Sequence, residues 1–307
     1  MKICAAADLH FPRQGRDWCA ELARRMCGSG ADVLVLAGDI ATGKEDAYRA
    51  LLGLFEGFAG PKLFVPGNHD LWGEADDRDT PQRYRGQLKE IVERYGFHYL
   101  PGAPLEHEGI GFVGSAGWYD YGFRQRTSPQ PEIRVTPLRA LPGDPTTRLR
   151  TMNGCRNIPW EDLTTTHYAG RALLWTDDGQ LQSMLWNDAV YVDWGEDDAS
   201  VARRMATEVQ ADIDRLGEGV DTLVAVYHCV PFEALLGGVA EDVGLAYCRA
   251  FMGSHLLGEV LLRDERFRLA LCGHAHHQKV LEIGHLVAAN CSVANGAGGP
   301  LLLTLET

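Results

Sequence analysis

Apolar runs and polar breaks alternate in a regular order along the first hundred residues. Residues 2–7, 32–37 and 62–65 are short apolar runs of the length of strands, and the second is apolar without interruption, as expected for a strand covered on both faces. Between them, residues 14–28 and 45–58 have apolar positions at helical spacing. The order β-α-β-α-β predicts a parallel sheet layered with helices.

The same pattern returns later in the chain. We expect further helices and strands at residues 80–95 (helix), 97–100, 105–107 and 111–114 (strands), 198–216 (helix), 221–227 (strand), 254–264 (helix) and 268–272 (strand). Three short strands should follow to the C-terminus, with Asn295-Gly296 as a hairpin turn.

Residues 116 to about 190 show no long period and are rich in Pro, Thr, Arg, Trp and Gly. A stretch of this length without its own elements is usually a cap, a lid or a mobile loop in a compact domain. We therefore expect one domain over residues 1–307, with an insertion or cap at about 115–195 that packs beside the core.

Composition narrows the function classes. The net charge of -13 argues against broad binding to nucleic acid or to anionic membranes. The N-terminal apolar run is too short for a signal peptide, and no run approaches the ~18 apolar residues of a membrane span. The eight cysteines include no CxxC pair, which favours reduced thiols and a cytoplasmic protein; the oligomeric state is open.

Side chains that can bind metals follow the predicted strands. In chain order they are Asp8 with His10, Asp39, Asn68 with His69 and Asp70, His228, and His274 with His276. Taken singly each has an ordinary explanation, such as a helix cap for Asp39. Together they fall at the carboxyl ends of strands, where α/β sheets bind ligands. Carboxylate, imidazole and amide donors suit two divalent ions, with Mn expected first and Fe, Zn or Mg as alternatives.

In order and spacing, this chain resembles the calcineurin-like metallophosphoesterase superfamily. The pattern is Asp-x-His, Gly-Asp, Gly-Asn-His-Asp, a lone His and Gly-His-x-His, over residues 1 to about 100 and 220–307. The resemblance implies a four-layer α/β/β/α sandwich of two mixed sheets, with the active site at the C-terminal strand ends. It implies as metal ligands Asp8, His10 and His276 for one ion, Asn68, His228 and His274 for the other, and Asp39 as the bridge.

The resemblance also implies an enzyme that hydrolyses phosphoesters. A bridging hydroxide would attack phosphorus in line, and His69 would protonate the leaving oxygen. Asp70 would fix the geometry of the loop or of the imidazole. The alternatives are a DNA nuclease of the same superfamily and a non-catalytic binding scaffold.

The substrate is expected to be a small phosphodiester or phosphomonoester. Asp70 stands where the protein phosphatases have Glu, and their phosphate-binding Arg is missing, so that branch is disfavoured. Trp118 and Tyr119 are candidates to stack on a substrate ring, and Arg13 and Arg124 to contact phosphate. Seven arginines lie between residues 121 and 160. They would form either a phosphate-gripping cap or a solvated loop.

Overall fold

The computed structural model describes residues 1–42, 44–73, 79–139, 157–296 and 298–306. Its first sheet has the order β15-β1-β2-β3-β4. The strands are β1 (Lys2–Ala6), β2 (Val33–Ala37), β3 (Lys62–Val65), β4 (Phe97–Tyr99) and β15 (Leu301–Thr304). The strands from β1 to β4 pair in parallel, and β15 pairs antiparallel to β1. This agrees with the parallel arrangement predicted from the first hundred residues.

The second sheet has the order β13-β14-β12-β11-β6-β5 and is mixed. Its strands are β5 (Leu105–His107), β6 (Ile110–Ser115), β11 (Thr222–Tyr227), β12 (Phe267–Cys272), β13 (Gln278–Ile283) and β14 (Leu286–Cys291). Four central strands are parallel to one another, and the edge strands β5 and β13 are antiparallel.

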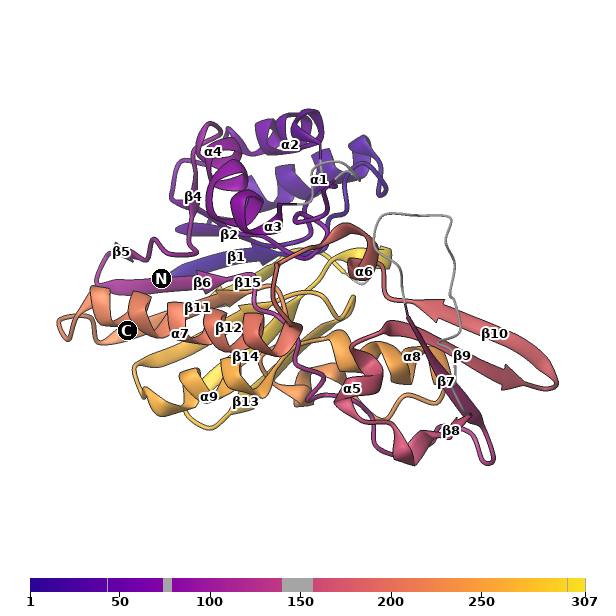
Figure 1. The fold of residues 1–307 in the computed structure, drawn as a ribbon. Coiled ribbons are helices and arrows are strands. Elements are labelled where there is room, and N and C mark those ends of the chain that lie inside the picture. The colour runs from indigo at the N-terminus through magenta and orange to yellow at the C-terminus, as the bar shows by residue number, and fades with distance from the viewer. Residues whose placement is uncertain (43, 74–78, 140–156, 297, 307) are drawn as a thin grey trace.

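Alternating side chains divide the two sheets into an inner and an outer face. Val33 and Val35 of the first sheet pack with Val224 and Val226 of the second in one buried cluster between them. The outer faces are covered by α1 (Arg16–Cys27), α2 (Glu45–Leu52) and α4 (Leu88–Glu93) on the first sheet and by α7 (Asp198–Leu216) and α9 (His255–Arg263) on the second. Figure 1 shows this order of helices, sheet, sheet and helices, which confirms the predicted four-layer sandwich.

Two of the predicted helices are less regular than expected. Residues 80–95 begin as α3 (Thr80–Gln82), continue through one π-helical turn (Arg83–Gln87) and end as α4. The helix predicted to reach residue 58 ends at Leu52 and is followed by one 3-10 turn (Gly53–Phe55). Other short helices are α8 (Val243–Cys248) and 3-10 turns at Trp160–Asp162, Glu233–Leu236, Arg249–Phe251 and Ala294–Gly296.

The insertion contains a third sheet, so the expectation of a stretch without elements is wrong. Its strands are β7 (Arg134–Arg139), β8 (Ile158–Pro159), β9 (Arg171–Asp177) and β10 (Gln180–Leu185), in the order β10-β9-β7-β8, with α5 (Thr165–Tyr168) and α6 (Asp188–Tyr191) beside them. All three pairings are antiparallel. Figure 1 shows that this sheet extends from one end of the sandwich.

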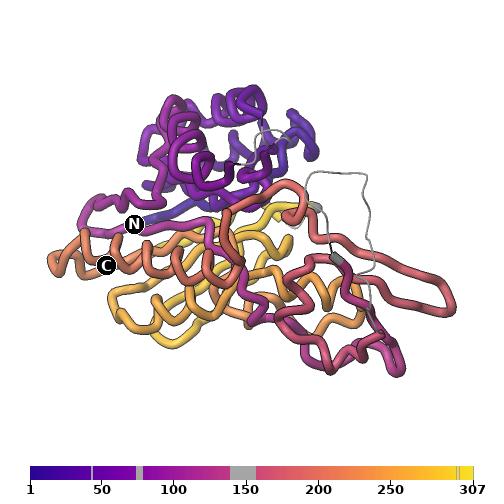
Figure 2. Tube along the Cα trace, viewed as in Figure 1, coloured from indigo at the N-terminus to yellow at the C-terminus, as the bar shows by residue number. Residues whose placement is uncertain are grey.

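The end of the chain differs from the predicted hairpin. β13 and β14 are the antiparallel pair, and residues 284–285 join them. Asn295-Gly296 instead lies in the connection from β14 to β15, which belong to different sheets. Because β15 pairs with β1, the two termini lie side by side (Figure 2), and the Met1 ammonium donates to the carbonyl of Leu305 at 2.9 Å.

Within the described ranges, none of the helices has both the length and the apolar character needed to cross a bilayer.

Candidate metal centre

The predicted ligands all follow the carboxyl ends of parallel strands. The strands and the ligands that follow them are β1 with Asp8 and His10, β2 with Asp39, β3 with Asn68, β11 with His228, and β12 with His274 and His276. β1, β2 and β3 are neighbours in the first sheet, and β11 and β12 are neighbours in the second. Backbone bonds tie the loops together: Asp8 N donates to Gly38 O at 3.0 Å and Gly273 N to His228 O at 3.0 Å.

Five of the seven predicted ligands have a left-handed backbone. Their φ values are 60° for Asp8, 45° for His10, 53° for Asp39, 70° for His274 and 55° for His276. Residues with a Cβ rarely adopt this region, and such strain is found mainly at functional sites. The fold therefore holds these loops in a conformation that their local sequence does not favour.

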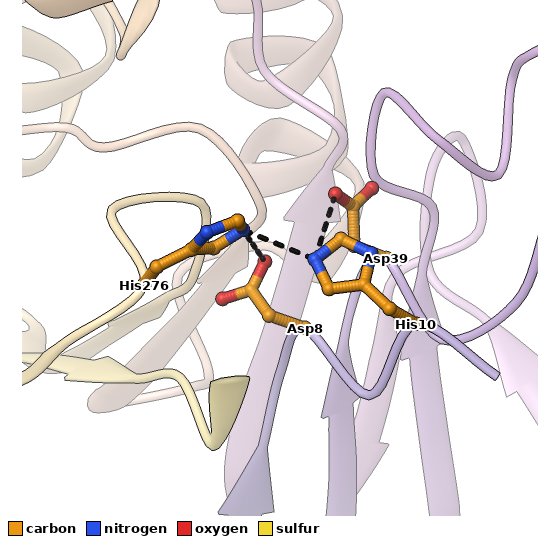
Figure 3. A group of neighbouring side chains, drawn as sticks. All are labelled: Asp8, His10, Asp39 and His276. Carbon is orange, nitrogen blue, oxygen red and sulfur yellow. Dashed lines mark hydrogen bonds and ion pairs between the residues drawn. The ribbon is translucent and has the colours of Figure 1, made fainter. Parts of the chain in front are cut away.

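One group of ligand atoms joins the two sheets. The side chains of Asp8, His10, Asp39 and His276 each offer an atom, and all four atoms lie within 4.8 Å of one another. In Figure 3 the two imidazoles point their Nε2 atoms toward each other, 3.0 Å apart, with the Asp8 carboxylate beside His276 and the Asp39 carboxylate beside His10. His276 Nε2 is 3.8 Å from Asp8 Oδ1, and His10 Nε2 is 3.9 Å from Asp39 Oδ2.

A second group shares Asp39 with the first. Asp39, His228 and His274 again bring ligand atoms within 4.8 Å of one another, and all three side chains are buried. His228 Nε2 lies 3.4 Å from Asp39 Oδ1, 3.2 Å from His274 Nδ1 and 3.2 Å from Asn68 Oδ1. The two oxygens of Asp39 thus face different groups, so this carboxylate is placed to be shared by both.

Outer hydrogen bonds set the tautomers of the second group. His228 Nδ1 donates to the carbonyl of Ala37 and His274 Nε2 to that of Phe251, each at 3.0 Å. Because a carbonyl only accepts, each ring donates through that nitrogen, and its other nitrogen carries a lone pair when the ring is neutral, as a metal ligand must be. His228 Nε2 and His274 Nδ1 lie 3.2 Å apart, so either a proton on His228 or a bound cation can lie between them.

The donor set fits divalent cations. Asp39 Oδ2 is buried and has no hydrogen-bond partner among the described residues, which is costly unless a cation satisfies it. Imidazole nitrogens with carboxylate and amide oxygens are ligands that Mn, Fe and Zn accept. The residues present therefore fit a pair of divalent ions held by the two groups.

The electrostatics favour cations in both groups. Burial lowers the pKa of His10 to about 4, and burial together with His228 lowers that of His274 to about 3, so both rings are neutral near pH 7. Burial also lowers the pKa of His228, but the Asp39 carboxylate outweighs it and raises the value to about 9. Burial would raise the pKa of Asp39 itself, yet the adjacent His228 and His69 keep it well below its usual range.

His69 lies beside the ligand groups without belonging to either. Its side chain is 23% exposed, and Nε2 is 3.9 Å from Asp39 Oδ2. Its backbone N–H donates to Asp39 Oδ1 at 2.8 Å, and its ring centroid is 4.7 Å from that of His10. This imidazole can therefore reach a bound molecule while its backbone is fixed to the shared carboxylate.

Asp70 points away from the ligand groups into the loops that carry them. It accepts from the backbone N–H of Asp39 at 2.7 Å and of Gly67 at 2.8 Å, and from Tyr48 Oη at 2.7 Å. Burial and the nearby Asp39 raise its pKa to about 6. These contacts are of the kind expected for a residue that fixes loop geometry.

The structure does not place the four substrate candidates together at the ligand groups. The rings of Trp118 and Tyr119 are buried, so neither can stack on a substrate ring, contrary to the prediction. Arg124 donates to the carbonyl of Tyr121 within its own loop. Arg13 is exposed, and its backbone N–H donates to the His10 carbonyl at 2.7 Å. Of the other arginines in the insertion, Arg148, Arg150, Arg156 and the side chain of Arg139 lie outside the described residues.

Sequence reasoning missed the residues that surround the second group and His69. Asp188 is buried and accepts from Asn68 Nδ2 at 2.9 Å, although 120 residues separate them. Trp72 stacks on His69 with ring centroids 3.7 Å apart, and Trp186 lies edge-on to His274 at 5.8 Å. Trp72 could have been suspected, because it comes two residues after Asp70. No local signal marks Asp188.

Comparisons with known proteins agree with this geometry. A sequence model of the family described as calcineurin-like phosphoesterase matches residues 1–278. No curated protein matches the chain. Among solved structures, a phosphopantetheinyl hydrolase from Mycobacterium tuberculosis is similar, with a TM-score of 0.60 and 17% identity over 96% of this chain and 90% of that chain.

Two further structures have lower scores. A dimetal phosphatase from Danio rerio has a TM-score of 0.47 and 11% identity, over 94% of this chain and 86% of that chain. A Thermus thermophilus protein has a TM-score of 0.47 and 14% identity, over 94% and 88%. At such identities a structural likeness describes the fold only.

Proposed function

This chain belongs to the calcineurin-like phosphoesterase family, and we propose that it hydrolyses a small phosphodiester or phosphomonoester with two divalent ions, Mn first among them. One observation carries the proposal: two ligand groups share the buried Asp39, and the partly exposed His69 lies beside them. A single structural ion would need neither a carboxylate shared with a second group nor a partly exposed imidazole beside it.

The proposed ligand roles follow the two groups. Asp8, His10 and His276 would hold one ion, Asn68, His228 and His274 the other, and Asp39 would touch both. When bound, such ions neutralise the charge of a phosphoryl group and lower the pKa of water. Loops with left-handed backbone and hydrogen bonds to buried carbonyls hold these donors in place.

His69 is the proposed general acid. It would give a proton from its imidazole to the oxygen of the leaving group, a contribution of typically about 10²–10⁴-fold. Its N–H bond to Asp39 and its stack on Trp72 hold the ring beside the site without making it a ligand. Asp70 supports this site by binding the loop backbones, and we propose no direct chemical step for it.

The substrate class rests on charge and on exposure. The net charge of -13 disfavours long nucleic acids, and Arg13 is a proposed phosphate contact because it is exposed three residues after His10. We propose residues 115–195 as a cap that shapes the site. Candidate substrates for a panel are cyclic nucleotides, nucleotides, phospholipid head groups and sugar phosphates. A phosphopantetheinyl ester is added because a solved structure of similar fold is a phosphopantetheinyl hydrolase.

The test is hydrolysis of bis-p-nitrophenyl phosphate and p-nitrophenyl phosphate by the Mn²⁺-loaded protein. We expect turnover of at least one probe, lost after chelation. His69→Asn should lower the rate by about 10²–10⁴-fold with two ions still bound. His107→Asn on the edge strand β5 is the control and should keep the full rate.

Three results would change the proposal. A metal-loaded protein that cleaves neither probe would be a binding scaffold. Cleavage of single-stranded DNA but of no small probe would indicate a nuclease. A full rate in His69→Asn would remove His69 as the acid while leaving the hydrolase intact.

A further inference from the structure

We infer that Asp188, in the insertion, is a positioning residue for two members of the site at once, the ligand Asn68 and the acid His69; this rests on the proposed function. The side chain is completely buried at the start of α6. Four donors converge on it. They are Asn68 Nδ2 at 2.9 Å and Trp72 Nε1 at 2.7 Å on Oδ1, and Trp186 Nε1 at 2.8 Å and Tyr119 Oη at 3.3 Å on Oδ2.

The first consequence concerns the orientation of the Asn68 amide. An amide can present either its oxygen or its NH₂ group to a neighbour. Because the Asp188 carboxylate only accepts, the NH₂ group must face Asp188, which turns Oδ1 towards His228 Nε2 at 3.2 Å. Asp188 thereby selects the face of Asn68 that can bind a cation, as outer partners of metal ligands commonly do.

The second consequence concerns the His69 ring. Trp72 is parallel to His69, with centroids 3.7 Å apart and an interplanar angle of 23°. It is also parallel to Tyr191, at 4.7 Å and 26°. The indole N–H of Trp72 is fixed on Asp188, so the whole stack has one polar anchor. The His69 ring cannot rotate without losing its stacking contact with Trp72.

The same carboxylate also reaches the support of His274. Trp186 donates to Asp188, and its ring stacks on Phe251 with centroids 4.8 Å apart. The carbonyl of Phe251 accepts from His274 Nε2. Beyond the two members that it positions, Asp188 is thus linked indirectly to His274, and its side chain comes from the insertion and not from the sandwich.

Asp198 provides a matched comparison within the same part of the chain. It too is buried and accepts from an indole and a phenol, Trp118 Nε1 at 2.7 Å and Tyr121 Oη, together with the Arg171 guanidinium. None of these donors is a candidate metal ligand. Loss of either carboxylate should weaken packing, but only Asp188 should affect the site.

The experiment measures both Mn²⁺ affinities, the melting temperature and the kinetics on bis-p-nitrophenyl phosphate for Asp188→Asn and Asp198→Asn. In Asp188→Asn an NH₂ group replaces one carboxylate oxygen, so a donor would face groups that already donate to that position. We expect one Mn²⁺ affinity to fall by about 10–100-fold, with a lower kcat, whereas Asp198→Asn should lower only the melting temperature. Wild-type affinities for both ions in Asp188→Asn, with a loss of stability like that of Asp198→Asn, would overturn the inference.

A second variant separates the effect of Asp188 on His69 from its effect on Asn68. Trp72→Phe keeps a ring on His69 but removes the N–H bond to Asp188. It should leave both Mn²⁺ affinities unchanged and lower kcat with little change in KM, because only the acid loses its anchor. An unchanged kcat would contradict the positioning of His69 by Asp188 through Trp72.

The contact between Asp188 and the amide of Asn68 can also be tested in the unmodified chain. In the Zn²⁺-loaded, isotope-labelled protein, the side-chain NH₂ of Asn68 should exchange slowly with solvent, and its signal can be assigned by its absence in Asn68→Ser. Exchange at the rate of a free amide would contradict the contact even if Asp188→Asn failed to fold. If the wild type cleaves no probe, the proposed hydrolase fails, while the affinities and exchange rates still decide the role of Asp188.

Discussion

At the scale of single residues, the site depends on how closely the backbone of one loop approaches the side chain of another. Asp39 faces both ligand groups, and the loop that carries Asn68 passes directly over it. Gly67 makes that passage possible, because a Cβ at this position would overlap Asp39 Oδ1 and lie 2.5 Å from Asp39 N. The glycine before Asn68 is therefore required by space and not by the turn alone.

Gly67→Ala should displace Asp39 and weaken Mn²⁺ binding. The overlap is with buried groups that cannot move freely, and such overpacking costs typically about 1–3 kcal/mol. We expect a lower melting temperature together with a lower Mn²⁺ affinity, measured by calorimetry. Gly57→Ala is the control, since a Cβ there meets nothing within 4 Å. Equal metal affinities in the two variants would contradict the steric argument.

At the scale of elements, the insertion is fixed to the sandwich by a buried ion pair. Arg171 at the start of β9 donates through Nε to Asp198 Oδ2 at 3.1 Å, and Asp198 begins α7. The two side chains are 14% and 5% exposed. Trp118 and Tyr121 donate to the same carboxylate. A long helix of the sandwich and the third sheet thus share one polar anchor.

Arg171→Met should destabilise the protein by about 3 kcal/mol. Removing one partner of a buried pair costs about 3–5 kcal/mol, and the lower end applies because two neutral donors remain on Asp198. Urea unfolding measures this change. Arg263→Met, which breaks the exposed pair with Glu259, is the control and should change stability by less than about 0.5 kcal/mol. Equal effects would show that the buried pair is not an anchor.

At the scale of the whole molecule, the ligand groups link the two sheets. Asp8, Asp39 and Asn68 come from the first sheet, and His228 and His274 from the second. Ions bound by both sheets can bind only the folded chain, because unfolding separates these residues. Metal binding and folding should therefore be coupled.

Mn²⁺ should raise the melting temperature, and chelation should reverse the change. At a concentration 100 times the dissociation constant, one bound ion adds about 2.7 kcal/mol to the free energy of unfolding. In a chain of this size that is roughly 4 °C in scanning calorimetry. Asp39→Asn, which removes the shared charge, should show a much smaller shift. Identical melting temperatures with and without Mn²⁺ would exclude binding across the sheets.

Much of the sandwich could be predicted because its signals are local. Continuous apolar runs such as residues 33–37 marked buried strands, and the period of residues 198–216 gave the bounds of α7. The third sheet had one readable signal that was missed. Asp178-Gly179 joins β9 and β10, with φ values of 46° and 75°, which is the geometry of a tight hairpin turn. Asn295-Gly296 has the same kind of signal without the paired strands, because pairing depends on distant partners.

The sequence by itself indicated the candidate ligand residues and their place at strand ends, because each motif is a few neighbouring residues after an apolar run. Only the tertiary structure decided which of them lie around Asp39, that Trp118 and Tyr119 are buried, and that the amide of Asn68 contacts Asp188. The physical reason is distance along the chain. Periodicity and turn chemistry act over a few residues, whereas a contact across 120 residues depends on how two separate parts of the chain pack.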